Sequence, residues 1–412
     1  MSFSLRCHLC ETPFPAEALW VCDKCLGPLE VVYDYEAIRG TITREIIAPR
    51  PRNLWRYREL LPIKGEPRTG LHSGFTPLVK ADRLAKKLGV RELYVKDDSI
   101  NHPTCSYKDR VVSVAATRAV ELGFSIFACA STGNLANSVA SHAARLGLSC
   151  AVFIPDDLEA GKVAGAAVFG PRVVAVRGNY DDVNRLCTQV ADKYQWGFAN
   201  INLRAYYAEG GKTTGFEIAE QLGWKFPKHL VCPVAGGTHL PRILKAFEEF
   251  RTLGIVDGDV PAVHVAQAAG CAPVVNALEA GLDFPDPVKP NTIAKSIAIG
   301  NPADGFQVIN AVRATGGSGA TVEEHEIVEG ITLLAETEGI FTEGAGGVTV
   351  MATRKLIERG AIPRDESIVI CITGNGYKTV ELVAGVVKPI HIGRSLGEFE
   401  AVLEEATPAR AT

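Results

Sequence analysis

Short apolar segments alternate along most of this chain with segments of helical period, and this alternation constrains the fold more than any other feature. The expected strands are ELYVKD (92–97), SIFACAS (125–131), SCAVFIP (149–155), RVVAVRG (172–178), HLVCPVAG (229–236), AVHVAQA (262–268) and SIVICITG (367–374). The expected helices lie at 107–122, 134–147, 181–194, 212–223, 239–252, 325–338 and 347–360. Near-continuous apolar strands separated by helices predict parallel sheets covered on both faces. With 412 residues the chain exceeds one average core, so we expect two or three domains.

Residues 1–38 precede this alternation and are expected to form a separate unit. Two C-x-x-C pairs, CHLC and CDKC, stand in it with 11 residues between them. Two such pairs can complete a tetrahedral shell, so Cys7, Cys10, Cys22 and Cys25 are candidate ligands of a structural zinc ion. The alternative is a ribbon whose cysteines hold no metal. The other seven cysteines lie mostly in apolar runs, where we expect reduced thiols rather than disulfides.

The composition excludes several classes of partner. The chain has 43 basic and 47 acidic residues, a net charge of -4, and therefore no basic excess that would indicate a nucleic-acid partner. Its longest apolar runs, such as SIVICI (367–372), are too short to span a bilayer. The start, MSFSLRCHLCETPF, lacks the apolar core of a signal peptide. We therefore expect a cytoplasmic protein that contacts no membrane.

Two junctions between a strand and a helix carry candidate chemistry in the first half of the chain. In an α/β sheet, ligands bind beyond the carboxyl ends of the strands. Lys108, in SYKDR, starts an apolar-periodic helix, where the positive end of the helix dipole disfavours an ammonium and suits a Schiff-base lysine. The turn S-T-G-N, ending at Asn134, opens the next helix, and its free amides can bind an anion. A surface lysine and a simple capping turn are the alternatives.

Two further junctions follow in the second half. The loop AGGTH (235–239) contains two glycines that let backbone amides close around a phosphate, although a turn that binds nothing fits as well. Thr373 ends a strand before Gly374, where its hydroxyl can bind a ring nitrogen or cap the turn. The glycine-rich run TEGAGGVTV (342–350) follows a helical segment, so we expect it to serve close helix packing rather than dinucleotide binding.

In this order, the junctions resemble the fold-type II enzymes that depend on pyridoxal phosphate (PLP), and among them the threonine synthases. The resemblance covers nearly the whole chain. It rests on FTPL (75–78), SYKDR (106–110), ASTGN (130–134), AEGGKTTGFEIAEQLG (208–223), IAIGNPADG (297–305), EGAGGVTV (343–350) and TGNGYK (373–378), and on the cysteine-rich start followed by GPLEVVYDY (27–35).

The resemblance implies an α/β fold of two doubly wound domains with the cofactor between them. The large domain would comprise 39–115 and 195–395, the small domain 116–194, and a tail 396–412, after the zinc-ribbon-like segment 1–38. Lys108 would carry PLP as a Schiff base, Asn134 would bind the 3'-oxygen of PLP, and Thr373 would face its ring nitrogen. The phosphate of PLP would be held by Ala235, Gly236, Gly237, Thr238 and His239. The substrate would contact Ser106, Ser131, Thr132 and Lys212.

The activity that the resemblance implies is the conversion of O-phospho-L-homoserine and water to L-threonine and phosphate, by γ-elimination and β-addition on PLP. This sequence departs from the family pattern at Ala208, where some members carry an arginine that grips the substrate phosphate. Lys212, Arg110 and Arg204 are the candidates to supply that charge instead.

Three alternatives to this activity stay open. Ala208 and Cys105 also fit a β-replacement enzyme similar to cysteate synthase, or a serine or threonine dehydratase, with the same cofactor. A binding protein that has lost catalysis would keep the fold without the chemistry. A nicotinamide dehydrogenase is disfavoured, because no strand leads into G-x-G-x-x-G with an acidic residue about 20 positions later. The family resemblance also implies a homodimer.

Overall fold

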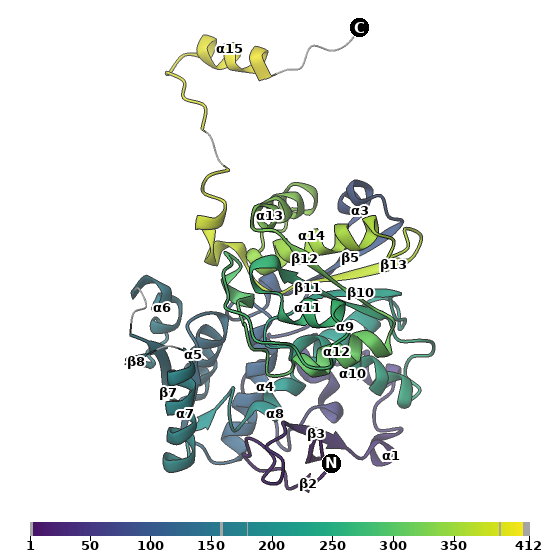
Figure 1. Ribbon diagram of the computed structural model, residues 1–412, viewed down its shortest axis with the longest axis vertical. Helices are drawn as coiled ribbons and strands as arrows, with labels where there is room; N and C mark the ends of the chain where they lie inside the picture. Colours follow the sequence, from purple (N-terminus) through teal and green to yellow (C-terminus); the bar gives the residue numbers. More distant parts are fainter. Residues whose placement is uncertain (1–2, 157–159, 179, 387–388, 407–412) are drawn as a thin grey trace.

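The computed structural model describes residues 3–156, 160–178, 180–386 and 389–406, and its strands form three sheets (Figure 1). The first sheet is antiparallel, with the order β2-β1-β3. Its strands are β1 (Phe3–Cys7), β2 (Pro13–Phe14) and β3 (Leu29–Tyr33). Together with the cysteine-rich loops between them, these strands form the unit that we call the ribbon.

A six-stranded sheet occupies the centre of the protein. Its order is β12 (Gly319–Val322), β11 (Ala262–Ala268), β10 (His229–Pro233), β13 (Ser367–Ile372), β5 (Glu92–Asp97) and β4 (Leu78–Lys80). The strands are parallel, as expected, except that β4 runs antiparallel to β5. The strands β4 and β12 were not expected, because segments of three and four residues are too short to show a periodic pattern.

A third sheet is fully parallel and has the order β8 (Arg172–Val176), β7 (Ser149–Pro155), β6 (Ile126–Ala130) and β9 (Gly197–Phe198). The strands of the ribbon lie within residues 3–33, and those of the central sheet within 78–372. The strands of the third sheet lie within 126–198, inside the range of the central sheet. The proposed boundaries between domains stay a prediction.

The helices lie between and beside these sheets. They are α1 (Tyr35–Ile38), α2 (Arg44–Ile47), α3 (Asp82–Leu88), α4 (Lys108–Glu121), α5 (Asn134–Leu146), α6 (Ala160–Ala167), α7 (Tyr180–Tyr194), α8 (Arg204–Glu209), α9 (Lys212–Gln221), α10 (His239–Thr252), α11 (Pro273–Glu279), α12 (Gly305–Ala314), α13 (Glu324–Glu338), α14 (Gly344–Glu358) and α15 (Leu396–Ala406). Short 3-10 helices add η1 (Leu54–Leu60), η2 (Asp98–Ile100), η3 (Ala269–Cys271), η4 (Lys295–Ile297), η5 (Gly376–Lys378) and η6 (Val380–Leu382).

The central sheet is buried on both faces, which explains its apolar strands. Side chains of β13 alternate between two cores: Ile368 and Ile370 belong to one, and Val369 and Cys371 to the other. This alternation follows from the two-residue period of a strand. The helices α3, α13 and α14 cover the first face, while α9 and α10 contribute to the second core. Burial on both faces is the reason that these strands have no polar side.

The glycine-rich run at 342–350 serves helix packing, as expected. A side chain at Gly347 would lie 2.2 Å from the carbonyl oxygen of Ile327, and one at Gly330 would lie 2.3 Å from the carbonyl oxygen of Gly347. Only glycine lets the backbones of α13 and α14 approach this closely. The helix begins at Gly344, three residues before the expected start, because this packing outweighs the poor helix propensity of glycine.

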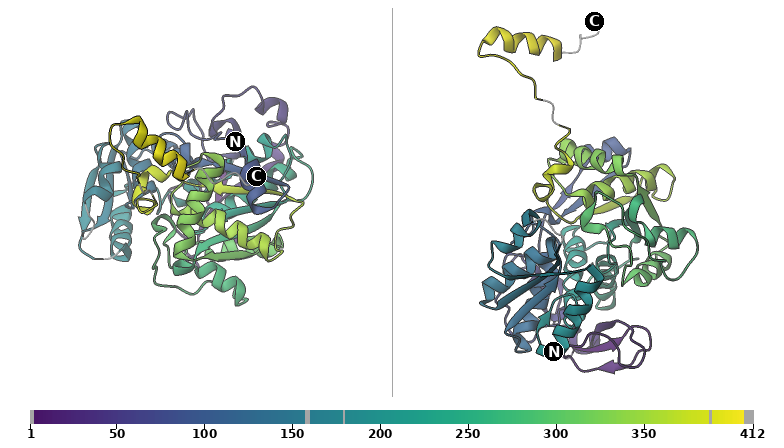
Figure 2. Two further views of the ribbon diagram at one scale, coloured as in Figure 1. Left: turned by 90° about the horizontal axis from the view of Figure 1, so that it is seen from above. Right: turned by 60° about the vertical axis from the view of Figure 1, so that its left-hand side comes forward.

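The two ends of the chain differ in their surroundings (Figure 2). The ribbon lies against the body of the protein, where Leu5 and Val31 join the same core as α4 and α10. In contrast, α15 stands away from the body at the end of an extended segment. The C-terminal tail that we expect at 396–412 is helical as far as Ala406, and 407–412 lie outside the described residues. Among the helices of the described residues, none is long and apolar enough to cross a membrane.

Candidate active site

Four junctions that lie far apart in the sequence come together at the carboxyl ends of the central strands. The strand β13 lies between β10 and β5, and all three run parallel. Their carboxyl ends therefore lie at the same end of the sheet. The chain beyond β5 leads to Lys108, β10 leads to residues 235–239, and β13 leads to Thr373. Asn134, the first residue of α5, joins them through hydrogen bonds with Glu343 and Lys378.

Lys108 occupies the first position of α4, directly beside the end of β13. The amide of Tyr107 donates to the carbonyl oxygen of Thr373 at 2.9 Å, and Ser106 forms a bridge with Gly374. The ammonium or amine nitrogen of Lys108 lies 3.0 Å from the hydroxyl of Tyr207 on α8. This geometry places a half-buried lysine at the helix start, next to the predicted partner of a ring nitrogen.

Asn134 is the first residue of α5, and its side chain contacts Glu343 and Lys378. Its amide nitrogen donates to Glu343 at 3.1 Å and 3.2 Å, and its amide oxygen accepts from Lys378 at 2.7 Å. Burial raises the pKa of Glu343 and lowers the pKa of Lys378. Glu343 also approaches Gly374, where an added side chain would lie 2.4 Å from its carboxylate. Glu343 and Lys378 lie in the motifs EGAGGVTV and TGNGYK, but no role was predicted for either residue, because their pairing with Asn134 joins distant segments.

The loop from Ala235 to His239 has the features of an anion cradle. Within the described part of the chain, the amides of residues 235–238 donate to no backbone carbonyl. Gly237 has φ +90°, and Gly236 faces open space. The loop leads into α10, whose first amides point back toward it. Free amides at a helix start favour a bound phosphate.

The side chains of this loop support its shape. Thr238 donates its hydroxyl to Asp304 at 2.7 Å. His239 stacks on Tyr107 with ring centroids 3.8 Å apart, which joins the loop to the residue before Lys108. Burial lowers the pKa of His239 to about 3, so its ring is neutral. Its imidazole therefore forms part of the wall rather than a charge in the site.

The predicted substrate residues fall into two groups. Ser106 is buried, and its hydroxyl has no partner among the described residues, while Ser131 and Thr132 are half-buried beside the start of α5. Lys212, in contrast, has no exposed surface, and its ammonium lies 2.9 Å from Glu249 and 2.7 Å from Glu209. This pairing gives Lys212 a structural role and speaks against the predicted contact with substrate.

The residues that converge here fit PLP. The segments that carry an amine, amides without backbone partners, a carboxamide and a threonine hydroxyl contact one another, and these groups suit the aldehyde, the phosphate, the phenolic oxygen and the ring nitrogen of PLP. The fit rests on Lys108, Asn134, Thr373 and the loop 235–239.

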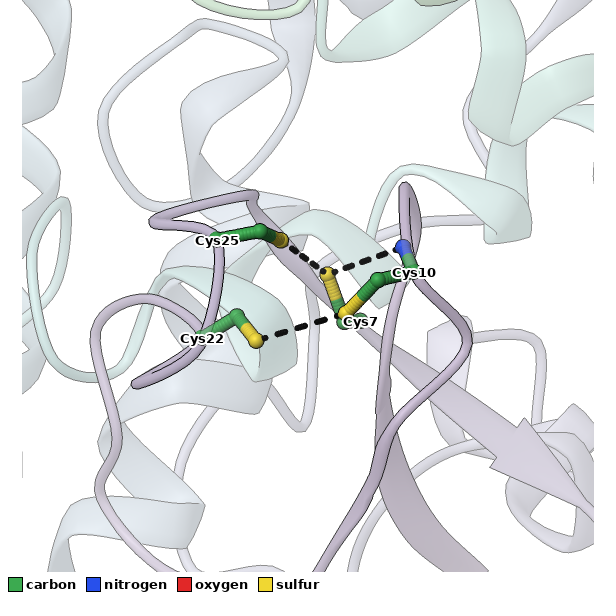
Figure 3. Close-up of side chains that lie close together, drawn as sticks. All are labelled: Cys7, Cys10, Cys22 and Cys25. Carbon is green, nitrogen blue, oxygen red and sulfur yellow. Dashed lines mark hydrogen bonds between the residues drawn. The ribbon is translucent and has the colours of Figure 1, made fainter.

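The four cysteines of the ribbon also converge (Figure 3). Their sulfur atoms all lie within 4.8 Å of one another, with 3.4 Å between Cys7 and Cys25 and 3.6 Å between Cys10 and Cys22. Sulfurs bound to one zinc ion in a tetrahedron lie about 3.8 Å apart, given Zn–S bonds of ~2.3 Å. The arrangement is compatible with zinc. All eleven cysteines are free of disulfides, as expected.

Comparison with known proteins identifies close relatives. The family model described as pyridoxal-phosphate dependent enzyme matches residues 70–374. A threonine synthase of Methanocaldococcus jannaschii is 38% identical over 405 residues, which cover 97% of this chain and 99% of the relative. A threonine synthase of Methanosarcina acetivorans is 39% identical over 387 residues, covering 93% and 94%. The similarity thus extends well beyond the part that the family model matches.

Solved structures show the same fold at lower identity. Maize serine racemase superimposes with a TM-score of 0.64 at 17% identity, covering 82% of this chain and 94% of that structure. Diaminopropionate ammonia lyase from Escherichia coli gives a TM-score of 0.65 at 18% identity, covering 84% and 94%. At these identities the likeness concerns the fold alone. It confirms the expected α/β architecture.

Proposed function

The chain belongs to the pyridoxal-phosphate dependent enzymes, among the threonine synthases, and we propose that it converts O-phospho-L-homoserine and water to L-threonine and phosphate. The observation that carries this proposal is the position of Lys108: its side-chain nitrogen, the cradle at 235–239 and Thr373 meet at one sheet edge, in a chain that is 38% identical to a threonine synthase over nearly its full length.

Each residue of the site would have a separate role in the reaction. PLP, when bound, supplies the electron sink that such a reaction needs. Lys108 is placed to hold a proton and to move it between the α- and β-carbons of the substrate. The hydroxyl of Tyr207, 3.0 Å away, orients the lysine nitrogen. The free amides at the start of α5, with Ser131 and Thr132, would bind the substrate carboxylate.

Asn134, Glu343 and Lys378 form a group of hydrogen-bonded side chains near the proposed site. Their hydrogen bonds join α5 of the third sheet to the loop after β13 of the central sheet. Because Glu343 is buried, this contact excludes water from one side of the site. Exclusion of water protects a reactive substrate and strengthens the remaining polar contacts.

The proposed experiment replaces Lys108 with alanine. The wild-type protein should show the absorption band of bound PLP, and borohydride reduction followed by peptide mass spectrometry should find the reduced adduct on Lys108. The K108A variant should lose the band and the turnover. An adduct on another residue, or full turnover by K108A, would overturn the assignment.

Substrate assays separate this proposal from its rivals with the same cofactor. The wild type should release phosphate from O-phospho-L-homoserine and form threonine. Turnover of phosphoserine with sulfite, or of free threonine, in place of that reaction would instead assign a β-replacement enzyme or a dehydratase.

We propose that the ribbon binds one structural zinc ion through Cys7, Cys10, Cys22 and Cys25. Four thiolates close the coordination shell, so no position remains for a reacting water. We further propose that the protein is cytoplasmic and homodimeric, in line with the free thiols and the family resemblance.

A further inference from the structure

A cavity of about 320 Å³ lies between the loop 69–73, residues 102–103 and the second half of α5. This volume far exceeds the roughly 10–15 Å³ that one water molecule needs. Its walls carry the basic side chains of Arg145, His72, His102 and His142, and no aspartate or glutamate is among the described residues that line it. None of the proposed PLP contacts lines it either. The cavity is therefore separate from the candidate active site and has basic walls.

Three of these basic side chains are available to a ligand. Arg145, His72 and His102 are exposed, and within the described part of the chain none of them forms an ion pair or a side-chain hydrogen bond. The rings of His72 and His102 lie 5.5 Å apart and nearly perpendicular to each other. A guanidinium offers five N–H donors in a fork that matches an oxyanion, so Arg145 is suited to bind one.

Ser141 adds a buried hydroxyl without a partner. This residue is 8% exposed and lines the cavity, and its hydroxyl makes no hydrogen bond to any described residue. A serine inside a helix can donate to the carbonyl oxygen four residues earlier, but Ser141 does not. A buried polar group without a partner costs free energy, so this hydroxyl favours a polar ligand in the cavity.

His142 connects the cavity to the start of α4. Its Nε2 lies 2.9 Å from the hydroxyl of Ser113, which also lies 2.5 Å from the carbonyl oxygen of Asp109. Ser138, one turn before His142, donates to the carboxylate of Asp109 at 2.7 Å. Asp109 directly follows Lys108. These contacts therefore join a wall of the cavity to the neighbour of the proposed Schiff-base lysine.

The protonation of His142 decides how the hydroxyl of Ser113 is used. Nδ1 of His142 lies 2.9 Å from the carbonyl oxygen of Ser138, which only accepts, so Nδ1 carries a hydrogen. A neutral His142 accepts the single hydroxyl proton of Ser113 at Nε2, and Ser113 then cannot donate to Asp109. A protonated His142 donates to Ser113 instead, which leaves that hydroxyl free to donate to the carbonyl oxygen of Asp109.

A bound anion would favour the second arrangement. Burial lowers the pKa of His142, so the ring is neutral in the empty cavity. The charged and titratable groups that face it are Asp109 on α4, His102 before α4, and His72 and Arg145 across the cavity. A negative charge beside an imidazole favours its protonated form. The ligand would thus add a hydrogen bond at the start of α4.

We propose that this cavity binds a small oxyanion, a carboxylate or a phosphate, through Arg145 and Ser141, and that the bound ion stabilises the start of α4 through His142. Because no acidic residue lines the described cavity, an ion that also carries an ammonium group is disfavoured. The site goes beyond the proposed function and does not depend on it.

Calorimetric titration of the full chain with bound PLP tests the site. The probes are inorganic phosphate, succinate and succinamide, the uncharged diamide of succinate. At least one of the two anions should bind with a Kd below about 10 mM, and the tighter one identifies the source of the oxyanion. Succinamide should not bind. Absence of binding by both anions, or equal binding of succinate and succinamide, would overturn the inference.

Variants then locate the bound ion. Arg145→Gln and Ser141→Ala should each weaken binding about 10- to 100-fold, as expected for the loss of a hydrogen bond to a charged group. The matched control is Arg83→Gln, because Arg83 is an exposed arginine of α3 that has no ion pair among the described residues and does not line the cavity. Its affinity should not change. Lys108→Ala should also keep the affinity, and a loss in this variant in place of Arg145→Gln would assign the ion to the reaction site and overturn the inference.

Hydrogen exchange followed by mass spectrometry tests the connection to α4. A saturating concentration of the anion should slow exchange of the backbone amides in residues 104–113. Ser113→Ala should keep the affinity but lose this protection, because it removes the hydroxyl between His142 and Asp109. Unchanged exchange in the wild type, or equal protection in Ser113→Ala, would contradict the connection. Both measurements need no turnover, so their outcome is distinct from that of the substrate assays.

Discussion

Two buried clusters of charge support the helices around Lys108, and they differ in their balance. The Arg110 cluster consists of Lys96, Asp98, Arg110 and Glu217. The Glu209 cluster consists of Glu209, Lys212, Arg242, Lys245 and Glu249, with Tyr33 from the ribbon. The first pairs two cations with two anions, and its ionic side chains are at most 3% exposed. The second has three cations for two anions.

The two clusters therefore differ in how their charges are compensated. In the Arg110 cluster, Arg110 contacts Asp98 at 2.7 Å and Glu217 at 2.8 Å, so every charge is satisfied internally. Arg110 is the third residue of α4, so its ion pairs hold the start of this helix, where Lys108 lies, against the rest of the protein. In the Glu209 cluster, Arg242 also lines a cavity with Asp304 and helps to lower the pKa of that carboxyl, so the balance of this cluster depends on a residue outside it.

The largest expected effect comes from breaking the balanced cluster. Arg110→Met should lower the free energy of unfolding by about 3–5 kcal/mol, because it leaves two buried carboxylates short of a cation. Urea unfolding measures this loss. Arg354→Met is the matched control: Arg354 also contacts two glutamates, but at the surface, and its loss should cost less than about 1 kcal/mol. Equal losses in the two variants would remove the distinction between buried and exposed pairs.

The second effect concerns the unbalanced cluster and depends on pH. Although burial alone would raise it, Lys212, Lys245 and Arg242 lower the pKa of Glu209 to about 2. The ionised group therefore stabilises the fold fully above its unfolded pKa of about 4.3, and this stabilisation is lost as the pH falls toward 2. Glu209→Gln should cost roughly 3 kcal/mol at pH 7. The groups that face Glu209 are Tyr33, Lys212, Arg242, Lys245 and Glu249.

The measurement is the free energy of unfolding of wild type and Glu209→Gln from pH 7 to pH 3. The difference between the two proteins should shrink as the pH falls below about 4. The carboxylates of the Arg110 cluster titrate equally in both proteins and cancel in the difference. A difference that stays constant over this range would show that Glu209 is not the titrating group.

Metal removal tests how strongly the ribbon supports the Glu209 cluster. Chelation of the proposed zinc should lower the melting temperature by a few degrees, since β3 would lose its anchor while the Arg110 cluster keeps its contacts. The absorption band of PLP should remain, because no cysteine of the ribbon lies among the proposed cofactor contacts. Loss of the PLP band before any change in melting temperature would contradict this separation.

The smallest effect isolates the contact between ribbon and cluster. Tyr33 donates its hydroxyl to Glu209 at 2.9 Å, and its ring lies 4.1 Å from the ammonium of Lys212. Tyr33→Phe keeps the ring and removes the hydrogen bond, which should cost about 1 kcal/mol. Tyr94→Phe is the control, because Tyr94 bonds Glu92 near the surface, and thermal unfolding should barely change. Equal shifts of the melting temperature in both variants would show that the contact between Tyr33 and Glu209 stabilises the protein no more than the surface contact of Tyr94.

The sequence by itself determined the local features of this protein. Strand and helix periods, the two C-x-x-C pairs and the glycine runs depend on residues close together in the chain. They therefore predicted the main strands, the helices α4, α5, α7, α9, α10, α13 and α14, and the cysteine cluster. The packing role of 342–350 was also visible, because three glycines in a helical segment favour close approach. Short strands such as β4 and β12 were not predicted, since they contain too few residues to show a periodic pattern.

Which of these features lie next to one another depends on how the chain folds. Lys108 and Tyr207 are 99 residues apart, and Asn134 and Glu343 are 209 residues apart, so no local pattern could pair them. Lys212 looked available in the sequence, but the fold buries it between two glutamates. Burial and charge pairing depend on how helices from distant segments pack. For that reason, the contacts of Lys108 with Tyr207 and of Asn134 with Glu343 could be found only in the folded chain.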